Sequence, residues 1–308
     1  MRSYQRLLIL LVVILLASCV VGSALKPVVD GLVKSSAYFA RKSGYDETSG
    51  TYNYGKIFRR IMMLTALVAF IALRRWIRLE RLSSLGLSFR RGWWRLLLNG
   101  LIVGIVSLMT YTALLWLFGV RHLTALENLS SSRVLRYALQ GLAVGFIEET
   151  IFRGFLLQTA LRDGRKLPAV VLVSAVYSGL HFLRGRVTVT MGFDALVGFR
   201  SLAVLVTSEK SFTGIVAPFV GLLFVGVVLS YAYLWTKSLY LPIGLHAGWV
   251  FALKCSSRLL DAPTRLGWLY GSSRVVDGVG SLVLLAIVMY ILWRVYGRNA
   301  DEERSAVS

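Results

Sequence analysis

Residues 147–154 read Ile-Glu-Glu-Thr-Ile-Phe-Arg-Gly and place two carboxylates and a guanidinium inside an otherwise apolar stretch. Ionisable groups at membrane depth are expensive and usually mark a functional site. At about 100° per residue, Glu149 and Arg153 share one helical face, and a Glu four residues before an Arg is the favourable order for an ion pair. Glu148 lies about 100° away from that face. The pattern predicts one carboxylate paired with Arg153 and a second that faces another partner.

The composition of the whole chain is that of a polytopic membrane protein. Its 308 residues are 56% hydrophobic, with a mean hydropathy of +0.66, which is outside the range of soluble domains. We predict an all-α transmembrane helix bundle of about eight spans, or seven if one weak run is re-entrant. The predicted spans are Leu7–Leu25, Ile61–Leu73, Leu96–Phe118, Tyr137–Leu161, Leu167–Leu183, Ile215–Trp235, Ser238–Leu253 and Gly278–Trp293.

The net charge of +20 points to a membrane surface. Basic residues lie mostly at helix ends and between spans, which favours anionic lipids as a partner and argues against nucleic acid. Residues 74–95 contain seven Arg and one Glu, so the positive-inside rule assigns this loop and both termini to the cytoplasm. Residues 16–19 resemble a bacterial lipobox, but apolar sequence continues to Leu25. We therefore expect an uncleaved first span in a multi-pass cell-membrane protein, in a bacterial inner membrane.

Two of the three histidines lie in apolar runs. His181 and His246 do so, whereas His122 is in a polar loop. One intramembrane His is often only a hydrogen-bonding group between helices, but two of them beside a di-glutamate helix favour a site. We predict that Glu148, His181 and His246 meet in one cavity and hold a water. A desolvated carboxylate is a better general base, and imidazoles relay protons or polarise a carbonyl, which suits peptide hydrolysis without a Ser or Cys nucleophile.

Three motifs in this order resemble those of the CAAX-protease and bacteriocin-processing family of intramembrane endopeptidases, also called CPBP or Abi. Residues 148–153 match E-E-x-x-x-R, and residues 177–181 are similar to F-x-x-x-H with Tyr in place of Phe. H-x-x-x-N is matched only at His246, because position 250 is Val250. The resemblance implies an eight-helix fold. The catalytic residues that it implies are Glu148, Glu149, Arg153, His181 and His246.

The resemblance also implies a role for each of these residues. Glu148 would activate the attacking water with help from His181, and Glu149 and Arg153 would organise their helix. His246 and the family's Asn would stabilise the oxyanion.

Val250 is where the chain departs from the family pattern. It offers no hydrogen-bond donor, and loss of one oxyanion donor costs about 10²–10³ in rate. Either another group, such as the indole N–H of Trp249, takes the place of the Asn, or this protein is slow or inactive.

The sequence is expected to divide into three segments. Residues 1–133 hold N-terminal transmembrane helices with a basic cytoplasmic loop, residues 134–255 the catalytic CPBP-like core, and residues 256–308 a C-terminal transmembrane helix and tail. The polar interval Lys26–Lys56 is predicted as a loop with room for a short helix. Arg184–Gly214 is predicted as a second long connection, either a plain loop or a lid.

The leading hypothesis is an intramembrane endopeptidase without a cofactor that cleaves a membrane-embedded or membrane-tethered polypeptide. A Zn²⁺ enzyme is an alternative, since two His and one Glu could hold the metal with an open fourth position, although no H-E-x-x-H occurs. The non-enzymatic alternative is a catalytically impaired member that acts as a membrane binding, immunity or scaffold protein. Cys19 and Cys255 are the only cysteines; they exclude a disulfide framework and allow one bridge at most.

Overall fold

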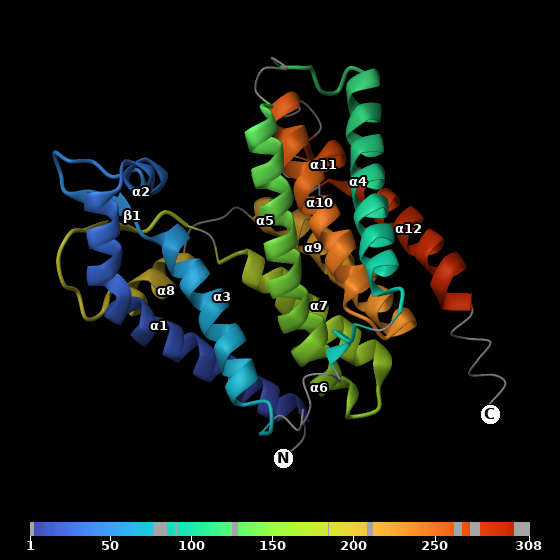
Figure 1. The fold of residues 1–308 in the computed structure, drawn as a ribbon, viewed down its shortest axis with the longest axis horizontal. Coiled ribbons are helices and arrows are strands. Elements are labelled where there is room, and N and C mark those ends of the chain that lie inside the picture. Colours follow the sequence, from blue (N-terminus) through green and yellow to red (C-terminus); the bar gives the residue numbers. More distant parts are fainter. Residues whose placement is uncertain are drawn as a thin grey trace. The chain divides into compact units, whose positions relative to one another are not determined.

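A computed structural model of the protein describes residues 3–76, 85–89, 91–124, 129–183, 185–207, 212–261, 267–271 and 278–298. The prediction of an all-α fold is confirmed, because helices dominate these residues and one small sheet of two three-residue strands is the exception. The chain divides into two compact units (Figure 1). Unit 1 is residues 1–78 with 179–211, and unit 2 is residues 79–178 with 212–308.

Unit 1 joins the N-terminal helices to the segment that follows α7. Its elements are α1 (Ser3–Ser35), α2 (Ala37–Ser43), β1 (Thr51–Asn53), α3 (Gly55–Ala72), β2 (Thr188–Thr190) and α8 (Val197–Thr207). The prediction of a loop from Lys26 is wrong for its first part, because α1 continues through Pro27 to Ser35. A buried ion pair one turn apart, Lys26–Asp30 at 2.9 Å, holds this polar stretch in the helix.

The connection predicted for Arg184–Gly214 contains regular structure. Strand β2 pairs antiparallel with β1, with Thr51 opposite Thr190, and α8 packs closely on α1. A Cβ added at Gly198 would lie 2.0 Å from the Cys19 carbonyl oxygen, so only glycine permits this approach. The connection is therefore part of a packed unit, built from segments far apart in the sequence.

Unit 2 is a helix bundle that carries Glu148, Glu149 and His246. Its elements are α4 (Trp93–Leu117), α5 (Ser131–Glu149), the π-helix η3 (Thr150–Leu157), α6 (Gln158–Leu161), α7 (Lys166–His181), α9 (Phe212–Thr236), α10 (Tyr240–Leu259), α11 (Gly267–Tyr270), α12 (Val279–Leu292) and the π-helix η4 (Trp293–Gly297). The last three residues of α7, from Gly179 to His181, belong to unit 1.

Helix α10 lies between α4 and α5 (Figure 1). Pairs of glycines four residues apart bring the three backbones together. A Cβ at Gly104 would lie 2.4 Å from the Leu245 carbonyl oxygen, and one at Gly244 would lie 2.0 Å from that of Leu97. On the other side, a Cβ at Gly145 would lie 2.9 Å from the Ile243 carbonyl oxygen. Such small-residue contacts are typical of membrane helices, and they fix where α10 presents its side chains.

Four helices among the described residues are long and apolar enough to cross a membrane. They are Tyr4–Ser35, Trp93–Leu117, Ile215–Thr236 and Val279–Gly297, and Lys166–His181 and Val197–Thr207 are shorter apolar helices. Helices α3, α5 and α10 have 18, 19 and 20 residues, which are lengths near that of a membrane span. The total of about eight spans stays a prediction.

Both cysteines, Cys19 in α1 and Cys255 in α10, are buried free thiols. Each fills space between helices as a small apolar side chain.

Candidate functional site in unit 2

The two glutamates stand at the end of α5, where the helix changes its winding. Helices α5, η3 and α6 follow one another without a break from Ser131 to Leu161. All eight residues of η3 are buried, including Arg153. A π-helical turn inside a longer helix often marks a functional site. The wider turn begins directly after Glu149, at the charged motif itself.

Glu149 joins two partners on one oxygen. Its Oε1 accepts a hydrogen bond from Arg153 Nη1 at 2.9 Å and lies 2.7 Å from His246 Nδ1. Both side chains of the Glu149–Arg153 ion pair have no exposed surface. The ion pair expected from the i, i+4 spacing is therefore present, and His246 from α10 completes it.

The guanidinium of Arg153 is held on several sides. It donates from Nη2 to the Gly226 carbonyl oxygen at 3.0 Å and lies 4.9 Å from the centre of the Tyr177 ring. The Tyr177 ring also stands edge-on to the His246 ring, at 6.2 Å between centroids. An aromatic face stabilises a buried cation, and Tyr177 packs against both partners of Glu149.

Helix α9 reaches this cluster through its contact with α7. Ser178 Oγ donates to the Phe219 carbonyl oxygen at 2.8 Å, and a Cβ at Gly226 would lie 2.8 Å from that of Ser174. The close approach places the Gly226 carbonyl oxygen within reach of Arg153. The cluster is thus set by four helical segments, which explains why no local pattern describes it completely.

The other nitrogen of His246 lies toward the second carboxylate. Nε2 is 3.9 Å from Glu148 Oε2, and the Glu148 side chain keeps 14% of its surface exposed whereas Glu149 has none. An ionised carboxylate only accepts hydrogen bonds, so Nδ1 of His246 donates to Glu149. Nε2 is then the nitrogen available to the space beside Glu148.

His181 ends α7 on the unit 1 side of the division that falls after Ser178. The structure therefore brings together Glu148, Glu149, Arg153 and His246 within unit 2. The meeting of His181 with Glu148 stays a prediction.

The indole N–H of Trp249, suggested as a substitute for the missing Asn, already forms a hydrogen bond with another residue. Trp249 Nε1 donates to Ser107 Oγ on α4 at 3.1 Å, on the side of α10 that packs against α4. Its N–H is used between helices in this arrangement, and a role for Trp249 in place of the Asn stays a prediction. Val250 itself, half-buried, offers no donor.

Sequence reasoning missed three parts of the site. Gly226 carries no chemical signal, Ser107 reads as an ordinary helix residue, and Tyr177 was seen only as a departure from a motif. Its aromatic type at that position was the one available signal.

Among the described residues, no group of three or more His, Cys, Asp or Glu is arranged to hold a metal ion.

Comparison with known families identifies the segment around this site. Residues 130–252 match the family described as type II CAAX prenyl endopeptidase Rce1-like. The match contains all five candidate site residues and confirms the resemblance drawn from the motifs. It begins and ends close to the predicted segment 134–255, while the three-segment division of the chain stays a prediction. No curated protein and no solved structure matches the chain.

Proposed function

We propose that the unit 2 cluster hydrolyses a peptide bond inside the membrane, a function supported by the match of residues 130–252 to the type II CAAX prenyl endopeptidase Rce1-like family. The substrate is a membrane-embedded or membrane-tethered polypeptide, and no cofactor takes part. The observation that carries this proposal is the His246 imidazole between two carboxylates, 2.7 Å from Glu149 and 3.9 Å from Glu148.

Glu148 serves as the general base in this proposal. It is the carboxylate that keeps some exposure and has no part in the Arg153 pair. A water about 2.8 Å from both Glu148 Oε2 and His246 Nε2 would bridge their 3.9 Å separation at an angle of about 90°. That position suits proton transfer to the carboxylate as the oxygen attacks a carbonyl carbon, and the protonated Glu148 then gives this proton to the leaving amine as the C–N bond breaks. His181 assists this step from the end of α7.

His246 supplies the charge that stabilises the oxyanion. With the imidazole protonated, two carboxylates face one guanidinium and one imidazolium, and the buried cluster is neutral overall. Nδ1–H is taken by Glu149, and Nε2–H then donates to the developing oxyanion. Because position 250 is Val and not the family's Asn, His246 Nε2–H is the single oxyanion donor in this proposal. We therefore expect a slow enzyme.

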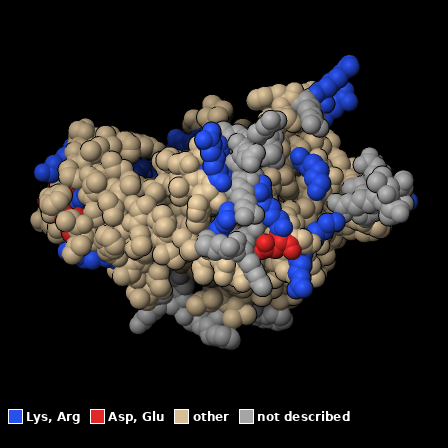
Figure 2. All heavy atoms as spheres, turned by 90° about the horizontal axis from the view of Figure 1, so that it is seen from below, with Lys and Arg blue, Asp and Glu red and all other residues tan. Residues whose placement is uncertain are grey.

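The site opens toward the cytoplasm in this proposal. Exposed basic residues gather at the end of unit 2 where α6 ends and α10 begins (Figure 2), namely Arg91, Arg95, Arg162, Arg165, Lys166, Lys237, Arg294 and Arg298. His246 follows Tyr240 by about 9 Å along α10, so the cluster is nearer to this end. The basic face binds anionic lipid headgroups of the cytoplasmic leaflet, as in a multi-pass protein of a bacterial inner membrane.

Accessibility of the basic loop tests this orientation. A cysteine introduced as Ser84→Cys should resist a membrane-impermeant maleimide in intact cells and react after lysis. Labelling of intact cells would reverse the orientation and the side from which the substrate enters.

The decisive experiment compares proteomes of cells that carry the wild-type protein or Glu148→Gln. Gln keeps the shape and removes the base, so we expect a cleaved membrane peptide to disappear and its rate in purified protein to fall about 10²–10⁴-fold. Glu47→Gln, an exposed carboxylate of unit 1, is the control. Equal peptide profiles for wild type and Glu148→Gln would argue against proteolysis, and loss of activity with a chelator would favour the Zn²⁺ alternative.

A second candidate function rests on the engaged Trp249 and on Val250. With one donor at the oxyanion position, the chain could act as a membrane binding, immunity or scaffold protein that uses the charged cluster to hold a partner. Such a protein tolerates Glu148→Gln, because the shape of the cluster is kept. The same comparison therefore separates the two functions.

A further inference from the structure

The polypeptide that follows His181 continues within unit 1. Leu183 packs against the buried core of this unit. Gly185 lies against α3, where a Cβ added at Gly55 would come within 2.9 Å of the Gly185 carbonyl oxygen. Two residues later, the Val187 carbonyl oxygen accepts the backbone N–H of Tyr54 at 2.8 Å. The segment is thus fixed by α3 and β1 within a few residues of the imidazole.

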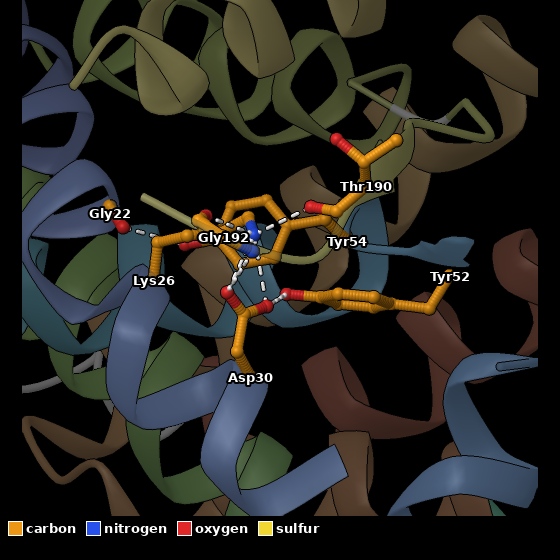
Figure 3. Close-up of polar contacts among 7 residues, drawn as sticks. All are labelled: Gly22, Lys26, Asp30, Tyr52, Tyr54, Thr190 and Gly192. Atoms are coloured by element: carbon orange, nitrogen blue, oxygen red, sulfur yellow. Dashed lines mark hydrogen bonds and ion pairs between the residues drawn. The ribbon is translucent and has the colours of Figure 1, made fainter. Parts of the chain in front are cut away.

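Lys26 of α1 holds the far end of this segment (Figure 3). Its side chain is fully buried, and Nζ donates to the carbonyl oxygens of Thr190 at 2.8 Å and Gly192 at 3.0 Å. Nζ also lies 2.9 Å from both carboxylate oxygens of Asp30. One ammonium therefore connects α1 to the backbone at the end of β2 and just beyond it.

Asp30 completes this cluster from the same helix. It accepts from the Tyr52 hydroxyl at 2.7 Å and from the Gly192 N–H at 3.1 Å. Burial, and then the adjacent carboxylate, raise the pKa of Tyr52, and burial together with the charge of Asp30 raises the pKa of Tyr54 to about 12. Tyr52 therefore stays a neutral donor at physiological pH. We call Lys26, Asp30 and Tyr52, with the Thr190 and Gly192 backbone, the Lys26 clamp.

The clamp compensates for a weak element. Strands β1 and β2 have three residues each, and an isolated two-stranded sheet of this kind is marginal in stability. A buried ion pair that loses one partner leaves an uncompensated charge. The three ammonium hydrogens and the Asp30 oxygens form hydrogen bonds inside the clamp. The clamp therefore holds the backbone in place and does not form a ligand site.

We propose that Lys26 is a positioning residue for His181. By holding β2, the clamp fixes the chain that leaves α7 and so sets where the imidazole stands. This inference rests on the proposed function, in which His181 assists Glu148. It assigns a role to residues 1–78, which lie outside the family match at residues 130–252.

The test uses the full-length protein and three variants. Lys26→Met removes the charge at similar length, Tyr52→Phe removes one hydroxyl of the clamp, and Lys34→Met removes an exposed charge on the same helix as a matched control. Three quantities are measured: hydrogen exchange of residues 185–192, the rate at which diethyl pyrocarbonate modifies His181, and kcat and KM for the peptide found by the Glu148→Gln comparison.

We expect Lys26→Met to speed exchange at residues 185–192, to change the modification rate of His181 and to lower kcat about 10- to 100-fold with KM little changed. Tyr52→Phe should change all three in the same direction by less, which keeps the test valid if Lys26→Met folds poorly. Lys34→Met should match wild type.

Two results would overturn the positioning role: faster exchange with unchanged kcat and unchanged His181 modification, or unchanged exchange in both clamp variants. Failure of the proposed function looks different. In that case wild type shows no Glu148-dependent cleavage, while exchange and His181 modification still decide whether the clamp positions His181.

Discussion

The two units each bury an ion pair with the same i, i+4 spacing, and the pairs differ in what surrounds them. In unit 1, Lys26–Asp30 is completed by carbonyl oxygens and a tyrosine hydroxyl. In unit 2, Glu149–Arg153 is completed by an imidazole whose other nitrogen lies 3.9 Å from a second carboxylate. Backbone carbonyls and a neutral phenol move no protons near pH 7, whereas imidazole and carboxylate do. A titratable neighbour, and not burial alone, marks the pair suited to chemistry.

The order of charges along the helix points the same way. Glu149 precedes Arg153, which is the order that a helix favours, whereas Lys26 precedes Asp30, which is the weaker order. The unit 1 pair therefore depends more on contacts from outside its helix. Those contacts come from β1 and from the segment around β2.

The largest effect is expected from Arg153→Met. It leaves the Glu149 carboxylate buried without its guanidinium, which should cost about 3–5 kcal/mol of unfolding free energy and abolish cleavage. Thermal unfolding in detergent and the peptide assay measure both, with Arg165→Met, exposed on the α6–α7 turn, as control. A stable and active Arg153→Met protein would remove the distinction between the two ion pairs.

A smaller effect, an increase in the rate of cleavage, is expected from Val250→Asn. Position 250 is one turn beyond His246 on α10, and an amide there adds a second oxyanion donor. Cleavage should rise by up to about 10²-fold, measured as kcat/KM on the same peptide. An unchanged or lower rate would mean that this turn of α10 does not face the oxyanion.

Gly104→Ala tests whether the packing of α10 sets the site. The new Cβ would lie 2.4 Å from the Leu245 carbonyl oxygen, so α10 must shift, at a cost of about 1–3 kcal/mol, and cleavage should fall as His246 moves from Glu149. Gly31→Ala in α1, with no atom within 4 Å of the added Cβ, is the control. Cleavage at the wild-type rate in Gly104→Ala would show that the position of His246 does not depend on this contact.

The smallest effect is expected from Trp249→Phe. It removes the hydrogen bond to Ser107 and should cost about 0.5–1.5 kcal/mol of stability, with cleavage unchanged. Stability comes from thermal unfolding and activity from the peptide assay. A large loss of activity at wild-type stability would indicate that the indole N–H donates to the oxyanion.

Local sequence was sufficient where one helix contains all the partners. The Glu149–Arg153 pair follows from helical periodicity, and the apolar runs at α4 and α9 predict long membrane helices. Lys26–Asp30 has the same spacing, yet the polar residues around it predicted a loop. The difference arises because its stabilising partners, Thr190 and Gly192, are more than 160 residues away.

Composition and the spacing of residues within one segment were enough to predict the helical class, the charged motif and the resemblance of that motif to a family. Packing between segments set which carboxylate holds His246, that the Trp249 indole bonds to Ser107, and that the polar residues after Leu25 continue a helix. Each depends on how closely two backbones approach, at Gly104 against Leu245 or at Gly198 against Cys19. Such an approach results from packing between segments distant in the sequence, which the period of a single helix does not encode.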